Sequence, residues 1–553
     1  MPDDTFEHGL PTDPQLRKVA RDTLEETLRA FPYVASDVGI HRWDDAMPDF
    51  SDAGQRARSE SLGRLRSALA DINPTRLTLD DWADWTTLTN QTALMTDDLV
   101  DWRPETRDPN LYNEIVSESV LSLTRRVFGL PIERAEHLIA RLDAVPELLR
   151  QAERLLDNPP RIFVAVALRQ FEATIPMLTE VAGAFSDLPS DRVDMLAAAG
   201  RRAAEAYGAF IEYLDQRWST RADGDFRLGE TRYQRRLGWQ EGVDLPLPQL
   251  LERGYQELAR LHAQLEQEVA GMGRNLSLSD VLQALRKDHP SAHTLLPNVR
   301  EVLDELRQFT ADHGLLSVPP APQPDVVETP AFMRLWTFAS LSTPGALETG
   351  PMKAHYQVTL PDPQAPPNEV EEHLQGFNRW SMRLISAHEV YPGHFAQFAV
   401  LPTTPSTVRK IFWSGAFVEG WAHYTEQLVV DEGYGDGEPW MRIAQIMEAL
   451  ERVGRYIVGI RLHAGDMTFD QAKEFFITEC HLMPVHAQRE AIRGTMDPFY
   501  LIYTFGKLEI YRLRERAKTA WGSEFTLKRF HDQLLAHGMP TFAVLERLLF
   551  TSS

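Results

Sequence analysis

Apolar residues recur at intervals of three and four along most of the chain, which is the spacing that gives an α-helix one buried face. The first such run begins at Asp13-Pro14, where an N-cap residue precedes a proline at the first helical position, and Pro32 ends it. Similar spacing predicts helical stretches over residues 55–72, 79–98, 111–156, 160–185, 191–218 and 245–272. The pattern therefore predicts a mainly α fold built as a large multi-helix body.

The pattern changes between Ser317 and Pro367, where frequent prolines exclude long helices. Within this segment, Lys353–Leu360 alternates in character and carries β-branched residues, so it is the best strand candidate. We therefore expect a small β-sheet here, next to the histidine-containing helices that follow. The edge of this strand could receive an extended peptide, with His355 or Tyr356 facing the site.

Helical spacing returns after the proline-rich segment. Asn368 is the expected N-cap of a helix that carries Glu371 at its third position and continues through Ile385. Further helices are predicted over residues 419–432, 440–462, 468–480, 523–536 and 540–550. The last third of the chain is thus expected to be helical around the residues that carry its chemistry.

Those residues begin in the segment Ser386–Gln397, which reads Ser-Ala-His-Glu-Val-Tyr-Pro-Gly-His-Phe-Ala-Gln and contains His388, Glu389 and His394. Glu419 follows twenty-five residues after the second histidine. Neutral imidazoles and carboxylates are zinc ligands, and a carboxylate beside the metal can take a proton from water. Two histidines, an adjacent carboxylate and a later glutamate therefore indicate a hydrolytic zinc site.

The spacing of the two histidines differs from the His-Glu-x-x-His pattern, in which both imidazoles lie on one helix face. Here Pro392 stands four residues after His388, and His394 comes two residues later. In a straight helix a six-residue separation turns the second side chain about 120° away from the first. Pro392 and Gly393 are residue types that break or redirect a helix. The proposed site therefore requires an interruption at Tyr391–Gly393 that returns His394 to His388.

The predicted helix after this segment carries Glu419, His423 and Glu426 at helical spacing, on one polar face. A glutamate buried among apolar residues needs a cation or a proton, so Glu419 is the expected third ligand. Glu426 is expected to accept a hydrogen bond from a ligand histidine and to orient it. His423 is expected in an outer or packing role, with direct ligation as the alternative.

Several short motifs are spread over nearly the whole chain. They are Gly39-x-His41, Glu328-Thr-Pro330, Phe377-Asn-Arg379, His388–His394, Glu419–Glu426 and Asp497–Lys507. The segment from Glu419 resembles the Asn-Glu-Gly-Phe-Ala segment of aminopeptidase N-like gluzincins, whose glutamate is the third zinc ligand. The whole set resembles more closely the bacterial family known as domain of unknown function 885, which is described as metallopeptidases. Phe395 stands where this family commonly has a second consecutive histidine, so His394 is the only candidate for that ligand.

The resemblance implies a mainly helical fold that holds zinc through His388, His394 and Glu419, with Glu389 as the general base. The implied activity is that of a zinc metallopeptidase that cleaves peptide bonds of short peptides with metal-activated water. Because the composition breaks near residues 225 and 315 are not flexible linkers, we expect one compact metallopeptidase-like unit. That unit spans residues 1–553, with possible lobes at 1–225 (helical, N-terminal), 226–315 (helical, middle) and 316–553 (catalytic).

Stabilisation of a developing oxyanion needs a further hydrogen-bond donor. Tyr503 is the candidate, because a neutral phenol can hydrogen-bond a developing negative charge, and Tyr500 is the alternative. Arg493 could hold a substrate carboxylate with its two-pronged guanidinium. A core tyrosine and a structural arginine remain the alternative interpretations of these residues.

Charge and cysteine content restrict the partners. The 57 basic and 80 acidic residues give a net charge of −23, which repels nucleic acid and anionic membrane surfaces. We expect no targeting segment and no membrane-spanning segment. The single cysteine, Cys480, agrees with a reducing compartment and is expected to be a buried, inert thiol rather than a nucleophile. These features predict a cytoplasmic protein with short peptides as partners, and they leave its oligomeric state open.

Two other functions remain compatible with the sequence. The same metal centre could serve an amidase or deacylase that acts on a non-peptide amide, because carbonyl chemistry specifies the zinc site but not the pocket. Alternatively, the histidines could pack inside a catalytically silent helical binding protein. Metal content and substrate range separate these three possibilities.

Overall fold

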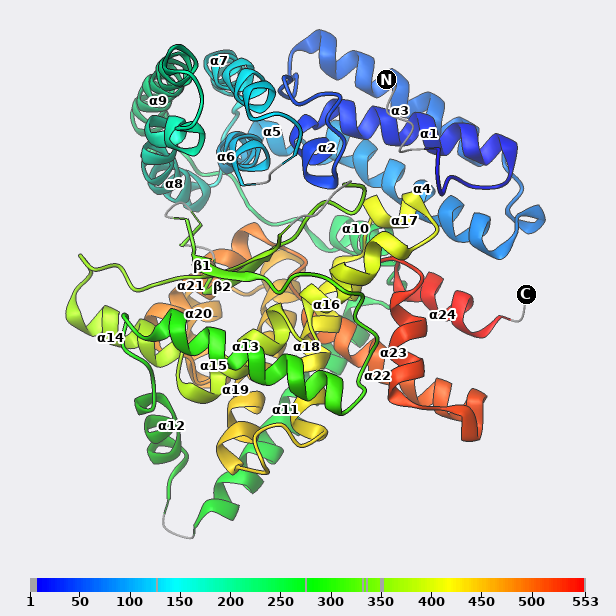
Figure 1. Cartoon of the computed structure of the whole chain (residues 1–553), viewed down its shortest axis with the longest axis vertical. Coiled ribbons are helices and arrows are strands. Elements are labelled where there is room, and N and C mark those ends of the chain that lie inside the picture. The colour runs from blue at the N-terminus through cyan, green and yellow to red at the C-terminus, as the bar shows by residue number, and fades with distance from the viewer. Residues whose placement is uncertain are drawn as a thin grey trace. The chain divides into compact units, whose positions relative to one another are not determined.

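The computed structural model describes residues 7–125, 128–273, 276–330, 333–334, 337–348 and 353–551. In these residues helices predominate, and the strands form one small three-stranded sheet (Figure 1). The predicted mainly α fold is therefore confirmed. The chain divides into two compact units. Unit 1 comprises Met1–Phe226, Pro344–Lys353 and Pro405–Phe412, and unit 2 comprises Arg227–Thr343, Ala354–Thr404 and Trp413–Ser553.

Unit 1 is helical, and its first helix begins as the sequence predicts. The side chain of Asp13 accepts a hydrogen bond of 2.9 Å from the backbone N–H of Leu16, and Pro14 occupies the first helical position. The helices of unit 1 are α1 (Pro14–Ala30), α2 (Pro32–Val38), α3 (Asp52–Ala70), α4 (Leu79–Asp97), α5 (Pro104–Arg107), α6 (Asn110–Thr124), α7 (Pro131–Leu155), α8 (Arg161–Glu180), α9 (Ser190–Trp218) and α17 (Thr407–Ile411). The stretch predicted over 111–156 thus forms two helices, α6 and α7.

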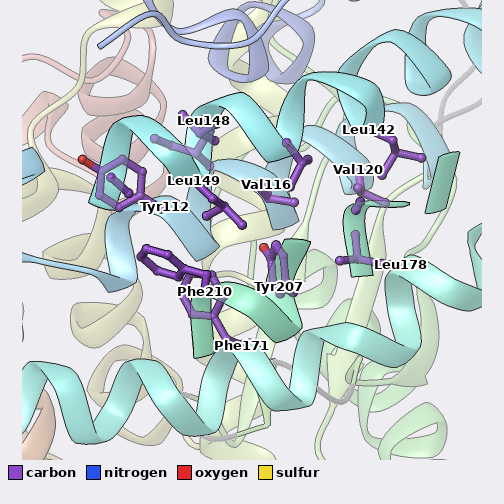
Figure 2. Close-up of a cluster of buried hydrophobic side chains, with 14 of the residues drawn as sticks. Tyr112, Val116, Val120, Leu142, Leu148, Leu149, Phe171, Leu178, Tyr207 and Phe210 are labelled. Atoms are coloured by element: carbon purple, nitrogen blue, oxygen red, sulfur yellow. The ribbon is translucent and has the colours of Figure 1, made fainter. Parts of the chain in front are cut away.

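The apolar faces of α6, α7, α8 and α9 meet in one buried cluster (Figure 2). Phe171, Tyr207 and Phe210 lie at its centre, with the ring centroid of Phe171 4.6 Å from that of Tyr207 and 5.0 Å from that of Phe210. Burial of side chains of this size contributes about 1.5–3 kcal/mol each. The three- and four-residue spacing of apolar positions places these residues on the faces of the helices that point toward one another.

One helical segment, Arg161–Phe185, is long and apolar enough to cross a membrane by length and composition alone. The sequence was expected to contain no segment of this kind, so that expectation was wrong on length and composition. Val164, Ala167 and Phe171 of this segment are buried in the cluster shared with α6, α7 and α9. Packing within unit 1 therefore accounts for its apolar face.

His41, which follows Gly39 in the first motif, is an ion-pairing residue in unit 1. Its Nδ1 lies 2.9 Å from Asp44 Oδ2 and its Nε2 lies 3.1 Å from Glu348 Oε2, and its ring stacks on Phe128. A Cβ on Gly39 would lie 2.5 Å from the backbone nitrogen of Glu348, so glycine lets that segment approach. Burial alone would lower the pKa of His41, but the two carboxylates raise it to about 9. His41 is therefore structural, and it holds its charge at neutral pH.

Replacement of His41 by glutamine is expected to destabilise the protein by about 1 kcal/mol at pH 6 and by much less at pH 10. The folded-state pKa lies above the unfolded value of about 6.5, so the ion pairs contribute fully below that pH and fade as pH rises through about 9. Urea unfolding midpoints at both pH values measure this difference. His293→Gln, at an exposed position, is the matched control. An equal deficit at pH 6 and pH 10 would contradict the charged role.

Unit 2 holds the residues of the predicted site. Its helices are α10 (Glu230–Glu241), α11 (Leu247–Met272), α12 (Leu278–Lys287), α13 (Leu295–Asp312), α14 (Pro367–Gly376), α15 (Arg379–Glu389), α16 (His394–Val400), α18 (Gly415–Asp431), α19 (Pro439–Ala464), α20 (Phe469–Thr478), α21 (Pro484–Met496), α22 (Ile502–Trp521), α23 (Leu527–Leu535) and α24 (Phe542–Phe550). The long helix α19 is buried along most of its length and packs against α11, α15, α21 and α22. It is the central helix of unit 2.

The sheet consists of β1 (Asp325–Glu328), β2 (Ala339–Ser342) and β3 (His355–Val358) in the order β1-β3-β2. The predicted strand over 353–360 is present as β3, and β2 packs against α15, so a small sheet beside that helix is confirmed. The expectation that an edge of β3 is free to receive a peptide is wrong. Strand β3 is paired on both sides, parallel to β1 and antiparallel to β2. Tyr356 is buried, with its hydroxyl 3.3 Å from Ser386 Oγ on α15.

The helix predicted from Asn368 through Ile385 is in fact two helices. The first, α14, begins at Pro367, and Asn378 ends the break by accepting hydrogen bonds from the backbone N–H groups of Trp380 and Ser381 at the start of α15. The motif Phe377-Asn-Arg379 is therefore a helix start. Helix α18 also begins earlier than predicted, at Gly415, so Glu419 lies in its second turn. The sequence analysis also did not predict α10, α12, α13, α21 or α22.

Candidate metal centre

The predicted interruption between the two histidines is present. Helix α15 ends at Glu389, and α16 begins at His394, so each histidine lies at a helix end that faces the other. Their ring centroids are 4.8 Å apart and their planes are nearly perpendicular, at 89°. A Cβ on Gly393 would lie 1.8 Å from the carbonyl oxygen of His388, a distance that no side chain can adopt. Glycine at this position is therefore required for the close return of the chain.

Trp421 connects this interruption to α18. Its indole N–H donates to the carbonyl oxygen of Pro392 at 3.1 Å and also lies 3.3 Å from that of Gly393, and its side chain is fully buried. Glu419 stands two residues before Trp421 on the same helix. The tryptophan thus fixes the position of Glu419 relative to both histidines, a role that the sequence analysis did not assign.

A pair of glycines brings α22 close to α18. A Cβ on Gly420 would lie 2.4 Å from the Cα of Gly506, and a Cβ on Gly506 would lie 1.8 Å from the carbonyl oxygen of Ala416. The two helix backbones are therefore in direct contact. The ring of Tyr503, on α22, lies over the ring of His388, with an angle of 23° between their planes and 6.3 Å between their centroids.

His388, His394 and Glu419 present their ligand atoms to one point. Glu419 Oε2 lies 3.4 Å from His388 Nε2 and 3.5 Å from His394 Nε2, and the three atoms all lie within 4.8 Å of one another. Burial would raise the pKa of the Glu419 carboxyl, but the two imidazoles hold it well below its usual range. The side chains predicted to bind the metal are thus brought together with the carboxylate ionised.

Glu426 binds the far side of His388. Its Oε1 lies 2.7 Å from His388 Nδ1, and its Oε2 lies 3.0 Å from His423 Nδ1. This bond leaves Nε2 of His388 available to a metal, an arrangement that is usual for zinc-binding histidines. The structure thus places Glu426 where the sequence analysis expected it. His423 does not belong to the group of converging ligand atoms, and its Nδ1 is held by Glu426 instead. Burial and the charge of Lys507 lower the pKa of His423 to about 3, so it is a neutral partner of Glu426.

Glu389 follows His388 directly and lines the adjacent cavity. Among the described residues its carboxylate makes no hydrogen bond and no ion pair. Burial raises its pKa above the usual range, while the charges of His388 and His394 oppose that shift. The carboxylate is therefore available for proton transfer beside the donor group.

The cavity has a volume of about 150 Å³. It is lined by residues of β2, α14, α15, α19, α21 and α22 and of the segment before β2. Tyr503 and Arg493 both line it, and the guanidinium of Arg493 donates to the Tyr503 hydroxyl at 2.9 Å. Burial raises the pKa of Tyr503 to about 12, so the phenol is neutral and keeps its proton for donation. Tyr500, the alternative donor, is fully buried and packs against Gly459 and Gly494 instead.

Arg493 does not present an open fork to the cavity. It also donates to Asp497 Oδ2 at 3.2 Å, so its hydrogen bonds already hold Asp497 and Tyr503. The predicted clamp on a substrate carboxylate is thus occupied by residues of the chain, and Arg493 positions the Tyr503 phenol. The sequence could not show this because both partners depend on how α21 and α22 meet.

Four charged residues of α19 line the same cavity, and the sequence analysis did not single them out. They are Glu448, Glu451, Arg452 and Arg455. The sequence did offer a sign of them, because they stand in the middle of a helix whose other positions are mostly apolar. Charged residues in such a place are expected to be buried in pairs. Arg452 lies 3.7 Å from Glu426 and so helps to keep that carboxylate ionised.

A second group of potential metal ligands lies in this cavity. It consists of Glu451, His486 and Glu490. The guanidinium of Arg455, however, donates to Glu490 at 2.6 and 2.9 Å and to Glu451 at 2.7 Å. A cation already occupies the place between these carboxylates, so the group of His388, His394 and Glu419 is the better candidate.

Comparison with known proteins assigns the chain to a family. The family described as "Bacterial protein of unknown function (DUF885)" matches residues 32–549. The chain belongs to the DUF885 family. The resemblance seen in the sequence motifs is therefore confirmed at the level of the family. No curated protein matched this DUF885 chain.

Two solved structures share the fold of this DUF885 protein. One, from Shewanella oneidensis, is described as "a putative lipoprotein of unknown function"; it is 22% identical with a TM-score of 0.79, and the match covers 96% of this chain and 99% of that one. The other is described as "the putative lipoprotein from Colwellia psychrerythraea" and is 18% identical with a TM-score of 0.80, over 96% and 98% of the two chains. At these identities the comparison shows a common fold.

Proposed function

We propose that this DUF885 protein is a zinc-dependent peptidase that hydrolyses short peptides. The observation that carries the proposal is the convergence of His388 Nε2, His394 Nε2 and Glu419 Oε2 beside the unpaired carboxylate of Glu389. Two imidazoles and one carboxylate are a donor set of catalytic zinc sites that keep a position open. The bond from Glu426 to His388 Nδ1 further supports this assignment.

The candidate metal ligands and the adjacent cavity together supply the groups that peptide hydrolysis needs. A zinc ion held by His388, His394 and Glu419 would polarise the peptide carbonyl and activate a water molecule. Glu389 takes the proton of the attacking water and returns it to the leaving amine. The Tyr503 hydroxyl, held by Arg493, donates a hydrogen bond to the oxygen on which negative charge develops.

The proposal predicts that the protein purified without chelator contains one transition-metal ion per chain and hydrolyses short peptides. Removal of the metal with a chelator is expected to reduce hydrolysis to the background rate, and added zinc is expected to restore it, because the metal supplies several kcal/mol of transition-state stabilisation. Elemental analysis and chromatography of peptide products measure both quantities.

The outcomes separate the three functions. Metal with peptide hydrolysis supports the proposal. Metal with hydrolysis of other amides but not of peptides would favour an amidase or deacylase. A protein without bound metal that leaves every amide intact would favour a binding protein and would overturn the proposal.

A cytoplasmic location stays a prediction. Its support is that the single cysteine agrees with a reducing compartment. Cys480 is fully buried and burial raises its pKa well above the usual range, so the thiol is unreactive. The two structural relatives are described as lipoproteins, which favours a membrane-anchored location instead. Recovery of the protein in the membrane fraction of its own cells would contradict the cytoplasmic prediction.

A further inference from the structure

Helix α21 carries two arginines one turn apart, Arg489 and Arg493, and both line the cavity beside His388 and Glu389. Arg493 is engaged by Asp497 and Tyr503. Arg489 differs, because in the part of the chain that the structure describes its guanidinium makes no hydrogen bond and no ion pair. The guanidinium of Arg489 lies over the ring of Phe338, with its carbon 5.9 Å from the ring centroid, which is a cation–π contact.

The other arginines of the cavity are paired with acids of the protein. Arg452 and Arg455 hold glutamates of α19 and α21, and Arg334 donates to Glu328 at 2.5 Å. The surroundings of Arg489 include Glu369 and Glu372 on α14, which act on it electrostatically without forming an ion pair. Glu372 instead accepts a hydrogen bond from the backbone N–H of Val485. The acids around Arg489 therefore leave its fork open.

A partly desolvated guanidinium without an acid partner is unfavourable unless an anion completes it. Arg489 is half-buried, and burial lowers its pKa, so it has lost part of its hydration. The planar fork of arginine matches a carboxylate, to which it can donate two parallel hydrogen bonds. The open fork of Arg489 is thus suited to an anionic group of a molecule that enters the cavity.

We propose that Arg489 binds a carboxylate of the substrate and so restricts the enzyme to peptides that carry one near the cleaved bond. This inference rests on the proposed peptidase function, because it concerns the cavity that is lined by Glu389 and by His388, one of the candidate metal ligands. The carboxylate belongs either to the C-terminus of the peptide or to an acidic side chain. Phe338, which contacts Arg489 and lines the same cavity, provides an apolar surface beside the bound anion.

The test compares three tetrapeptides of one apolar sequence: one with a C-terminal carboxylate, one with a C-terminal amide, and one with a C-terminal amide and an internal glutamate. Calorimetry with the metal-loaded Glu389→Gln protein gives each Kd, and the protein with Glu389 intact gives kcat/KM. Arg489→Met in both backgrounds is expected to weaken the binding of at least one of the two carboxylate-bearing peptides at least about tenfold. The affinity for the peptide that has only the C-terminal amide is expected to stay unchanged. Arg489→Lys keeps the charge without the fork and is expected to lie between.

Loss of binding by the first peptide alone assigns the carboxylate to the C-terminus, and loss by the glutamate peptide assigns it to a side chain. Equal affinities of Arg489→Met and the parent protein for all three peptides would overturn the inference. Arg529→Met, at an exposed position of α23 that does not line the cavity, is the matched control for loss of an arginine. Because calorimetry needs no turnover, an Arg489-dependent Kd in a protein that hydrolyses no peptide would reject the peptidase function and keep the anion site.

Discussion

Replacement of Glu389 by glutamine is expected to lower kcat/KM for peptide hydrolysis by about 10²- to 10⁴-fold while the bound metal is retained. Glutamine keeps the volume of the side chain and cannot take a proton from water. Among the described residues the Glu389 carboxylate has no hydrogen-bond or ion-pair partner, so the change breaks no structural contact. Glu389 is also not one of the three residues whose ligand atoms converge, so the variant is expected to keep its bound metal.

Steady-state kinetics and elemental analysis of the same preparation measure both parts of this result. Glu474→Gln, at an exposed position on α20, is the matched control and is expected to keep the parent rate. A rate retained by Glu389→Gln would reject Glu389 as the general base. A lost rate accompanied by lost metal would instead indicate that Glu389 helps to hold the ion.

Replacement of Gly393 by alanine is expected to weaken metal binding by about 10- to 100-fold and to lower the thermal midpoint. The new Cβ would lie 1.8 Å from the carbonyl oxygen of His388 and 2.4 Å from that of Ala387, so the backbone on one side of the interruption has to move. His388 stands on one side of it and His394 on the other, which means that any such movement separates the two imidazoles. Competition for zinc with a chromophoric chelator gives the affinity.

The matched control for Gly393→Ala is Gly271→Ala. Gly271 lies in α11, and a Cβ there would meet no atom within 4 Å. Alanine has the higher helix propensity, so this variant is expected to be as stable as the parent or up to about 1 kcal/mol more stable. If Gly393→Ala bound metal as tightly as Gly271→Ala, the interruption would not be what brings the histidines together.

The sequence predicted the helices well where one face is apolar and the other polar. The runs beginning at Asp13 and at 191 are examples, since α1 and α9 begin within one residue of the expected positions. The prediction of helix boundaries failed where a short polar motif, and not a change in apolar spacing, marks the boundary. At Asn378 the side chain caps the start of α15, although the apolar spacing continues from the helix before it. Pairing within the sheet was also out of reach, because a strand's own residues do not reveal how many neighbours it has.

For the candidate site, the sequence identified which residue types belong together but not what holds them. His388, His394 and Glu419 could be named from their chemistry and spacing. The carbonyl contact at Gly393 and the hydrogen bond from Trp421 could not, because both depend on backbone positions brought close by folding. For the same reason Arg493 was predicted to hold a substrate, whereas in the structure it holds Tyr503.

The direct backbone contact between Gly420 and Gly506 has a consequence for recognising this centre in other proteins. A larger residue at either position would push α22 away from α18 and carry Tyr503 away from His388 while every metal ligand remained in the sequence. A search for proteins with the same chemistry should therefore require glycine at these two positions as well as the two histidines and the glutamate. In chains that keep the metal ligands but lack the two glycines, the tyrosine is expected to lie away from the first histidine.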